Sequence, residues 1–397
     1  MNSQTVIITD GNQRAALAVV RSLGKAGFRC VVASPIRRSL AGVSRFAARE
    51  VVVPDALDAP SAFVHALAAL SRQENAVLIM PITEPSVLAV LPERQQFAPA
   101  VIPLADGETF STVSDKRRLL QEASALGIAV PQQTVLENAA AAKAFDVSTV
   151  TYPVVLKPSR SVGEQDGQRL KVGVSYASDS ADLRHRLDQC SPSVFPLLLQ
   201  QRIVGPGTGV FLLLWNGEIR ACFAHRRLLE RPPSGGVSVY CESVALDEKV
   251  LMQSRALLDR FGWRGVAMVE YKLDRASGTP YLMEVNGRFW GSLQLSIDSG
   301  VDFPNLLARV ALDLPTQPAA TFRVGTRSRW WWGQVDHVLA RIRRPEMRSL
   351  PSGTPGMIRT LTHFLLAPLR LGDREEVLRF ADPCPFWYET VRWFQGK

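Results

Sequence analysis

The sequence contains no long apolar run and no regular spacing of cysteine or histidine. Its longest apolar stretch, GVFLLLW, is far shorter than the ~20 residues that a membrane-spanning helix needs. The five cysteines are scattered without a CxxC pair, so neither a disulfide framework nor a zinc site is expected. The five histidines are also dispersed, which argues against a His-based metal site. The N-terminus lacks the basic and apolar regions of a signal peptide, and the scattered, unpaired cysteines favour a reducing cytoplasm.

Excess charge of one sign is also scarce outside the C-terminal region. The net charge is +9, but residues 321–397 hold 13 Arg and Lys against 7 Asp and Glu and so supply six of those charges. The rest of the chain is nearly balanced, and we therefore expect no nucleic-acid groove. At 397 residues, with 46% hydrophobic and 21% charged residues, the chain is expected to fold into roughly two to four globular domains.

The first hundred residues alternate strand and helix patterns but lack a G-x-G-x-x-G turn. Buried strands are predicted at 5–9, 29–34 and 76–81, and helices at 12–27 and 60–73. This βαβαβ order is typical of a doubly wound parallel sheet. The first turn reads TDGNQRA, so no dinucleotide is expected there. The loop PITEPS at 81–86 follows the carboxyl end of a strand, where such sheets place ligands, although an ordinary connecting loop fits equally well.

Two strands near residue 277 carry polar groups on one face. In YLMEVNGRFWG, Glu284, Asn286 and Arg288 point to one side of the strand, opposite Met283 and Val285, because side chains alternate between faces.

The strand GVAMVEYKLD precedes it, and the turn-forming segment RASGTP joins the two into a predicted hairpin. The hairpin midpoint near Ser277 places Glu270 opposite Glu284. Like charges in opposed positions destabilise a sheet, so this arrangement predicts a bound cation.

Two lysines lie at positions suited to anion binding. Ser114 or Asp115 can cap a helix that carries Lys116 in its first turn, where the helix dipole disfavours a cation. Lys116 is therefore expected either to be solvated or to face an anion. Lys157 ends a strand before a polar loop with Gly163 and Gly167. This pattern suits a phosphate site under a mobile cover, and an exposed lysine on a hairpin is the alternative.

A pair of adjacent arginines follows a second predicted hairpin, which turns at Asn216-Gly217. Arg226 and Arg227 precede the loop RPPSGG. Guanidinium groups bind phosphate or carboxylate in bidentate fashion, so the pair is a candidate oxyanion site. Simple surface charge is the alternative.

The order and spacing of these residues resemble the ATP-grasp superfamily over roughly residues 1–315. The most specific segment is VEYKLD…YLMEVNGRFWGS, which resembles the metal-binding hairpin of that family with its E-x-N-x-R strand. The resemblance implies that the nucleotide is ATP, with its phosphates bound by Lys116 and Lys157 and its adenine lined by Gln200, Gln201 and Ile203. It also implies one or two Mg²⁺ ions, or Mn²⁺, held by Glu270, Glu284 and Asn286. Arg288 would face the transferred phosphoryl group, and Arg226 and Arg227 would hold the substrate carboxylate.

The implied architecture has four parts. They are an N-terminal Rossmann-like domain at 1–110, the small and large ATP-grasp subdomains at 111–197 and 198–320, and a mostly helical extension at 321–397. Two features depart from the family. The hinge positions that often carry a ribose-binding acid read Gln201, Pro206 and Gly207, and the loop after Lys157 has fewer glycines than the usual phosphate lid.

The implied function is that of an ADP-forming carboxylate–amine ligase that acts through an acyl phosphate on small-molecule substrates. A carbonate-activating enzyme of the carboxylase or carbamoyl-phosphate type and a non-catalytic ATP-binding regulator remain alternatives. The chain has no A-M-K-M biotin-carrier sequence, which disfavours the carbonate-activating alternative.

The extension is basic and rich in aromatic residues. Trp330–Trp332 lie near a group of arginines, namely Arg327, Arg329, Arg341, Arg343 and Arg344. Such a segment can pack its aromatic side chains on the catalytic core with the arginines exposed, which is the favoured interpretation. It can also contact a membrane surface or a polyanion. The sequence leaves the oligomeric state open.

Overall fold

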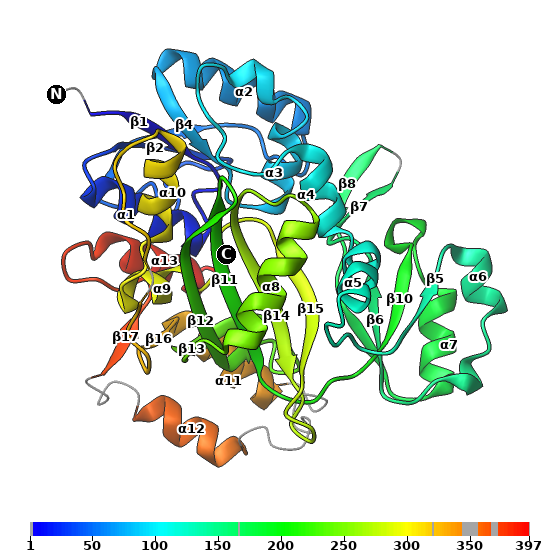
Figure 1. Ribbon diagram of the computed structural model, residues 1–397. Helices are drawn as coiled ribbons and strands as arrows, with labels where there is room; N and C mark the ends of the chain where they lie inside the picture. The colour runs from blue at the N-terminus through cyan, green and yellow to red at the C-terminus, as the bar shows by residue number, and fades with distance from the viewer. Residues whose placement is uncertain (1–2, 166, 320, 344–355, 367–371, 397) are drawn as a thin grey trace.

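The computed structural model describes residues 3–165, 167–319, 321–343, 356–366 and 372–396. Within these residues the strands form a four-stranded N-terminal sheet, a four-stranded small sheet, a seven-stranded large sheet and a separate two-stranded hairpin. Figure 1 shows the large sheet in the middle of the molecule, with the N-terminal sheet and the small sheet on different sides of it. No helix in the described ranges is long and apolar enough to span a bilayer.

The N-terminal sheet is parallel, with strand order β3-β2-β1-β4. This confirms the predicted doubly wound arrangement. The strand β3 was not predicted, and none of its residues is fully buried. Its other strands are nearly continuous apolar runs, as expected for strands covered on both faces. The elements are β1 (Thr5–Ile8), α1 (Arg14–Lys25), β2 (Arg29–Ser34), β3 (Ala47–Val52), α2 (Pro60–Gln73), β4 (Ala76–Met80) and α3 (Glu84–Val90).

The small sheet is antiparallel in the order β5-β10-β6-β9. Asp115 caps the helix at residues 116–125, which comes before this sheet in the chain. Its carboxylate accepts hydrogen bonds from the amides of Arg117 and Arg118, which confirms one of the two predicted caps. The boundary predicted after residue 197 falls within β10, which pairs entirely inside this sheet. The elements are α4 (Gly107–Ser114), α5 (Lys116–Ala125), β5 (Gln133–Leu136), α6 (Ala139–Ala144), β6 (Val154–Pro158), the hairpin β7 (Val162–Gln165) and β8 (Gln168–Lys171), β9 (Ser175–Ala177), α7 (Ser180–Asp188) and β10 (Leu197–Gln201).

The large sheet has the order β15-β14-β11-β12-β13-β16-β17. Asn216 and Gly217 both adopt positive φ, at 54° and 78°, as the tight turn between β11 and β12 requires. The elements before the extension are β11 (Gly207–Trp215), β12 (Glu218–Arg231), β13 (Val237–Ser243), α8 (Glu248–Arg260), β14 (Gly265–Leu273), β15 (Pro280–Asn286), α9 (Leu293–Ser299) and α10 (Phe303–Ala311).

The C-terminal extension adds strands to the large sheet as well as helices. Its elements are β16 (Arg327–Arg329), α11 (Trp331–Arg343), α12 (Met357–Leu365), β17 (Asp373–Glu375) and α13 (Cys384–Phe394). Trp332 is 8% exposed and stacks on Trp393 at 4.3 Å. Trp330 packs under Arg14 of the N-terminal domain, so these aromatic residues are used for packing. Arg344 of the predicted basic cluster lies outside the described residues, and contact with a membrane or polyanion stays a prediction.

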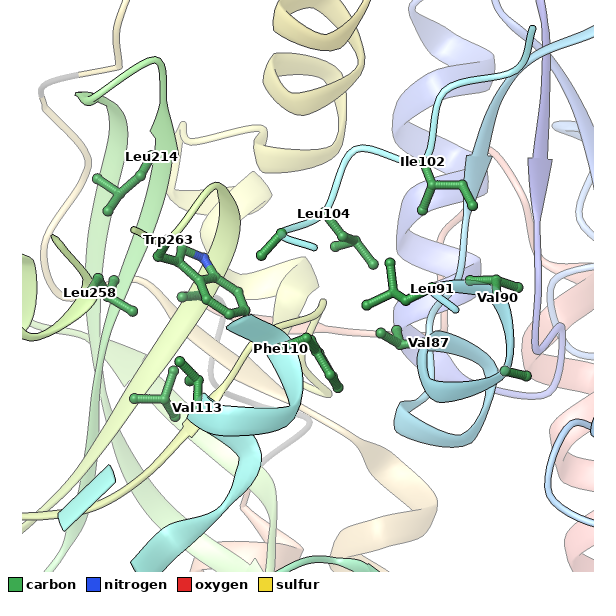
Figure 2. Close-up of a cluster of buried hydrophobic side chains, with 14 of the residues drawn as sticks. Val87, Val90, Leu91, Ile102, Leu104, Phe110, Val113, Leu214, Leu258 and Trp263 are labelled. Atoms are coloured by element: carbon green, nitrogen blue, oxygen red, sulfur yellow. The ribbon is translucent and has the colours of Figure 1, made fainter. Parts of the chain in front are cut away.

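A continuous apolar core joins the N-terminal domain to the large sheet. Figure 2 shows side chains of α3 and of the segment after it facing Phe110, Val113 and Trp263, with Leu214 and Leu258 behind them. Phe110 and Trp263 are 2% and 6% exposed. Because protein interiors are close-packed and resist deformation, this core fixes the beginning of α3 relative to the β14–β15 hairpin.

Candidate active site

The two acidic strands form the hairpin that the sequence predicts. β14 and β15 pair antiparallel, and Glu270 faces Glu284, which confirms the predicted register. A register shift next to Glu270 leaves Met283 as an extra residue in β15. Leu282 and Val285 therefore both face the core, whereas Met283 lines the cleft instead of sharing a face with Val285 as predicted. A bulge re-aims side chains because it interrupts the two-residue alternation.

Two lysines balance the charge of Glu284. The Nζ atom of Lys157 lies 3.4 Å from Glu284 Oε2 and donates to the carbonyl of Met283 at 3.0 Å. The Nζ atom of Lys116 lies 3.9 Å from the same oxygen and donates to Ser161 Oγ at 3.1 Å. Although burial favours the neutral acid, the two ammonium groups lower the pKa of Glu284 to about 2. The opposed carboxylates are thus already balanced by cations of the chain itself.

Arg227 balances the charge of the other carboxylate, Glu270. Its guanidinium donates to Glu270 and to Glu230 Oε1 at 3.0 Å. Burial raises the pKa of Glu270, and Arg227 opposes that rise. Burial of Arg227 would favour its neutral form, but Glu270 and Glu230 raise the pKa of Arg227 instead. Arg227 is therefore a paired cation within the site and not a free anion-binding group.

Arg226 does not join Arg227 in the main cleft, where the sequence prediction placed both. Successive residues of β12 point to opposite faces of the sheet, and Arg226 pairs with Glu242 of β13. The Arg226 side chain is 48% exposed, against 12% for Arg227. Both arginines line a neighbouring pocket of about 300 Å³, but only Arg227 also lines the main cleft.

Asn286 and Arg288 continue the polar face beyond Glu284. Asn286 Nδ2 donates to Glu284 Oε1 at 3.2 Å, and an Arg288 guanidinium nitrogen donates to the carbonyl of Phe289 at 3.0 Å. With Lys116 these residues line a polar recess of about 10 Å³. That volume is on the order of one water molecule.

Glu270, Glu284, Lys157, Arg227, Asn286 and Arg288 line one cleft of about 730 Å³, which is within the usual range for small-molecule sites. Lys116 lines only the polar recess, which shares Glu84, Glu284, Asn286 and Arg288 with this cleft. The N-terminal domain, the small sheet, the segment after β10 and the hairpin all contribute to its walls. The charged residues that line it are Arg14, Glu84, Lys157, Lys171, Arg202, Arg227, Glu230, Glu270, Lys272, Glu284 and Arg288.

The hinge residues predicted to line adenine lie at one end of this cleft. Gln200, Gln201 and Ile203 all contribute to its wall, and Gln200 Nε2 donates to Gln133 Oε1 at 2.7 Å. Lys272 also lies in the wall, and burial lowers the pKa of its ammonium. Lys272 lies on the same face of β14 as Glu270 because side chains alternate along a strand, but no role was predicted for Lys272.

The loop at 81–86 lies at the other end of the cleft. Asp10 fixes its conformation, since the Asp10 carboxylate accepts from Thr83 Oγ1 at 2.9 Å, Ser86 Oγ at 2.8 Å and the Thr83 amide at 3.1 Å. Glu84 then lines both the cleft and the polar recess. Arg14 also lines the cleft and was not predicted, because its partner Glu376 is too distant in sequence to leave a local signal.

The donor set fits a hard divalent cation. Glu270, Glu284 and Asn286 offer carboxylate and amide oxygens, which Mg²⁺ prefers. No group of three or more His, Cys, Asp or Glu capable of holding a metal occurs in the described part of the chain. An ion here would therefore complete its coordination with the amide, phosphate oxygens and water. Lys116 and Lys157 adjoin these oxygens and fit the phosphates.

A family model described as "ATP-grasp in the biosynthetic pathway with Ter operon" matches residues 193–332. These residues include the hinge, both arginines and the whole acidic hairpin. No curated protein sequence matches the chain significantly.

Solved structures resemble most of the chain at low sequence identity. The L-amino acid ligase from Bacillus licheniformis has a TM-score of 0.61 and 17% identity, with 80% of this chain and 76% of that chain covered. The biotin carboxylase from Campylobacter jejuni has a TM-score of 0.63 and 18% identity, with 82% and 74% covered. The N5-carboxyaminoimidazole synthetase from Staphylococcus aureus, solved with ADP, has a TM-score of 0.62 and 16% identity, with 82% and 80% covered. The predicted resemblance is confirmed at the level of the fold: this chain has the ATP-grasp fold.

Proposed function

We propose that the protein is an ATP-dependent carboxylate–amine ligase that forms an amide bond through an acyl phosphate and releases ADP. One observation carries this proposal. A single cleft brings together Lys157, two opposed carboxylates, Arg288 and the loop at 81–86, and Lys116 lies in the polar recess that shares Glu84, Glu284 and Arg288 with it. A carbonate-activating enzyme needs room for only a very small acceptor, whereas this cleft has a volume of about 730 Å³ and is also lined by residues 13–15 and 82–85 of the N-terminal domain.

Nucleotide binding would use the hinge residues for the adenine and the two lysines for the phosphates. Gln200, Gln201 and Ile203 would line the adenine, and Lys116 and Lys157 would bind the phosphates. Both lysines reach Glu284 at present, so phosphate binding would replace a carboxylate partner by a more highly charged one. Charge-assisted contacts of this kind are stronger than neutral hydrogen bonds.

The hairpin would hold the metal and position the phosphoryl group. Glu270, Glu284 and Asn286 would bind Mg²⁺, which neutralises charge on the β- and γ-phosphates when it is bound. Arg227 would keep Glu270 ionised and oriented through the contact described above. Arg288 would face the migrating phosphoryl group with a planar array of donors, and no nucleophile from the protein is required because the substrate carboxylate attacks the γ-phosphate.

The test is a screen of carboxylates with ATP, Mg²⁺ and hydroxylamine. A ligase of this class should form ADP and a substrate hydroxamate in equal amounts, because hydroxylamine traps an acyl phosphate. ADP formation that needs bicarbonate and gives no hydroxamate from any carboxylate would favour a carbonate-activating enzyme. Nucleotide binding without ADP formation under any condition would favour a regulator.

A further inference from the structure

Glu84 differs from the other carboxylates of the cleft in having no cationic partner. Glu270 and Glu230 both contact Arg227, and Glu284 contacts Lys157. Across the described ranges, no hydrogen bond or ion pair joins the Glu84 carboxylate to another group. Glu84 is half-buried, and a carboxylate that is partly withdrawn from water without a counter-charge is unfavourable, so its position at the cleft wall points to a partner that arrives with a ligand.

The surroundings of Glu84 fix where that partner would lie. Glu84 lines the small polar recess together with Arg288, Asn286 and Lys116, and it also lines the open cleft. The recess has room for a group about the size of one water, which suits the head of a primary amine. Arg288 is where the acyl phosphate would be held, so an amine at Glu84 would lie beside the carbon that it must attack.

The loop that carries Glu84 is held rigidly. Asp10 binds it through both side-chain and backbone contacts. The next turn of α3 is anchored in the core by Val87 and Val90 (Figure 2). A group that must meet a reacting atom needs this kind of support.

We propose that Glu84 binds the ammonium group of the amine substrate and accepts the proton that this group must lose before it attacks. The proposal rests on the ligase function proposed above. One proton passes from the ammonium to the Glu84 carboxylate and later to solvent. The nitrogen lone pair then forms the C–N bond as the C–O bond to phosphate breaks, the electron pair of that bond leaves with phosphate, and the second N–H proton goes to phosphate.

The charges around Glu84 are consistent with this role. Burial raises the pKa of Glu84, which brings a carboxyl group closer to the range in which a base works well near neutral pH. The neighbouring charges act in both directions: Arg288, Lys116 and Arg160 lower the pKa, and Glu284 raises it. A base must be ionised, so amide formation should fall as pH drops through the pKa of Glu84.

The experiment compares two acceptors in wild type and Glu84→Gln, using the carboxylate that gives most hydroxamate. Hydroxylamine is uncharged at neutral pH and needs no base to remove a first proton, whereas methylamine enters as methylammonium. We expect Glu84→Gln to keep hydroxamate formation within about twofold and to lower N-methylamide formation by about 100-fold, the scale of general-base catalysis. The acidic limb of the methylamine pH profile should also disappear. Glu84→Asp, which keeps the charge, should restore part of the rate.

The matched control is Glu93→Gln, an exposed carboxylate of the same domain that contacts Gln96, and it should leave both rates unchanged. Equal rates of N-methylamide formation in wild type and Glu84→Gln would overturn the proposal, as would a parallel loss of both products. Hydroxamate without any N-methylamide in wild type would also overturn it. Absence of both ADP and hydroxamate from wild type would instead refute the ligase function on which it rests.

Discussion

Replacing Glu284 by Gln tests whether the lysines stabilise the hairpin before any ligand binds. The opposed carboxylates alone predict that Glu284→Gln leaves the metal-free protein equally stable or slightly more stable, because it relieves repulsion with Glu270. The structure reverses that sign. Lys157 and Lys116 lie 3.4 and 3.9 Å from the Glu284 carboxylate, and a neutral amide would leave both buried ammonium groups without their main counter-charge.

The size of the effect follows from the pKa of Glu284. The value falls from an ordinary 4.5 to about 2, which corresponds to ~3 kcal/mol in favour of the ionised form. The side chain is 27% exposed, so solvent screening reduces this figure. We expect Glu284→Gln to lower the free energy of unfolding by about 2 kcal/mol at pH 7, which is less than the roughly 3–5 kcal/mol for breaking a fully buried ion pair.

The pH dependence gives the same test a second readout. A carboxyl group with a depressed folded-state pKa adds stability above its unfolded pKa, and that stability is lost as pH falls toward the folded value. The gap between wild type and Glu284→Gln should therefore be full at pH 6–7 and shrink steadily below about pH 4.5.

Urea unfolding in the presence of EDTA measures this gap, with Glu218→Gln as the control. Glu218 is 70% exposed and pairs only with Arg220 at the surface, where an ion pair contributes about 0–1 kcal/mol. A variant at Glu284 that is as stable as wild type at pH 7, or more so, would refute the idea that the lysines hold this carboxylate. ADP formation by Glu284→Gln should be abolished whether or not the variant is less stable than wild type.

Further predictions concern the division of roles and the extension. Lys157→Ala should weaken ATP binding by roughly 1.5–3 kcal/mol, whereas Arg288→Ala should reduce turnover far more than affinity; nucleotide titrations that show equal losses would contradict this division. Glu389→Gln should stabilise the protein by ~1–2 kcal/mol at pH 8, because burial raises the pKa of Glu389 to about 7, so its ionisation destabilises the fold as pH rises. Glutamine keeps an oxygen to accept from the Trp330 indole, and thermal unfolding should show a gain that is much larger at pH 8 than at pH 5.

The parts of the fold that could be predicted are those with local signals. The helix predicted at 60–73 has those bounds in the structure, because an apolar period and a proline at its first residue mark it within one segment. The Asn216-Gly217 turn and the Asp115 cap are likewise set by neighbouring residues. The pairing of Glu270 with Glu284 followed from the length of one hairpin.

The remainder depends on contacts between distant segments. β16 and β17 are three-residue strands, too short to show a pattern, and β16 is a strand because it pairs with β13 on one side and β17 on the other. Arg14 is placed by Trp330 and Glu376, both more than 300 positions away in the chain. The two lysines that contact Glu284 lie outside the hairpin, Lys157 in β6 of the small sheet and Lys116 in the helix α5. The bulge at Met283 also left no signal, since apolar residues occupy both candidate positions.

Arg226 and Arg227 provide the sharpest contrast between sequence and structure, because the sequence treats them as a pair and β12 separates them. Arg227→Ala would leave Glu270 and Glu230 buried near each other without their cation, and breaking such a pair costs about 3–5 kcal/mol. Arg226→Ala should cost at most ~1 kcal/mol, since its side chain is 48% exposed and Arg327 still pairs with Glu242. We expect hydroxamate formation and ATP affinity to stay within about twofold in Arg226→Ala. In Arg227→Ala, turnover should fall steeply together with the urea midpoint. Similar losses in both variants would mean that the two arginines act on one anion, and the assignment of Arg227 to Glu270 would have to be abandoned.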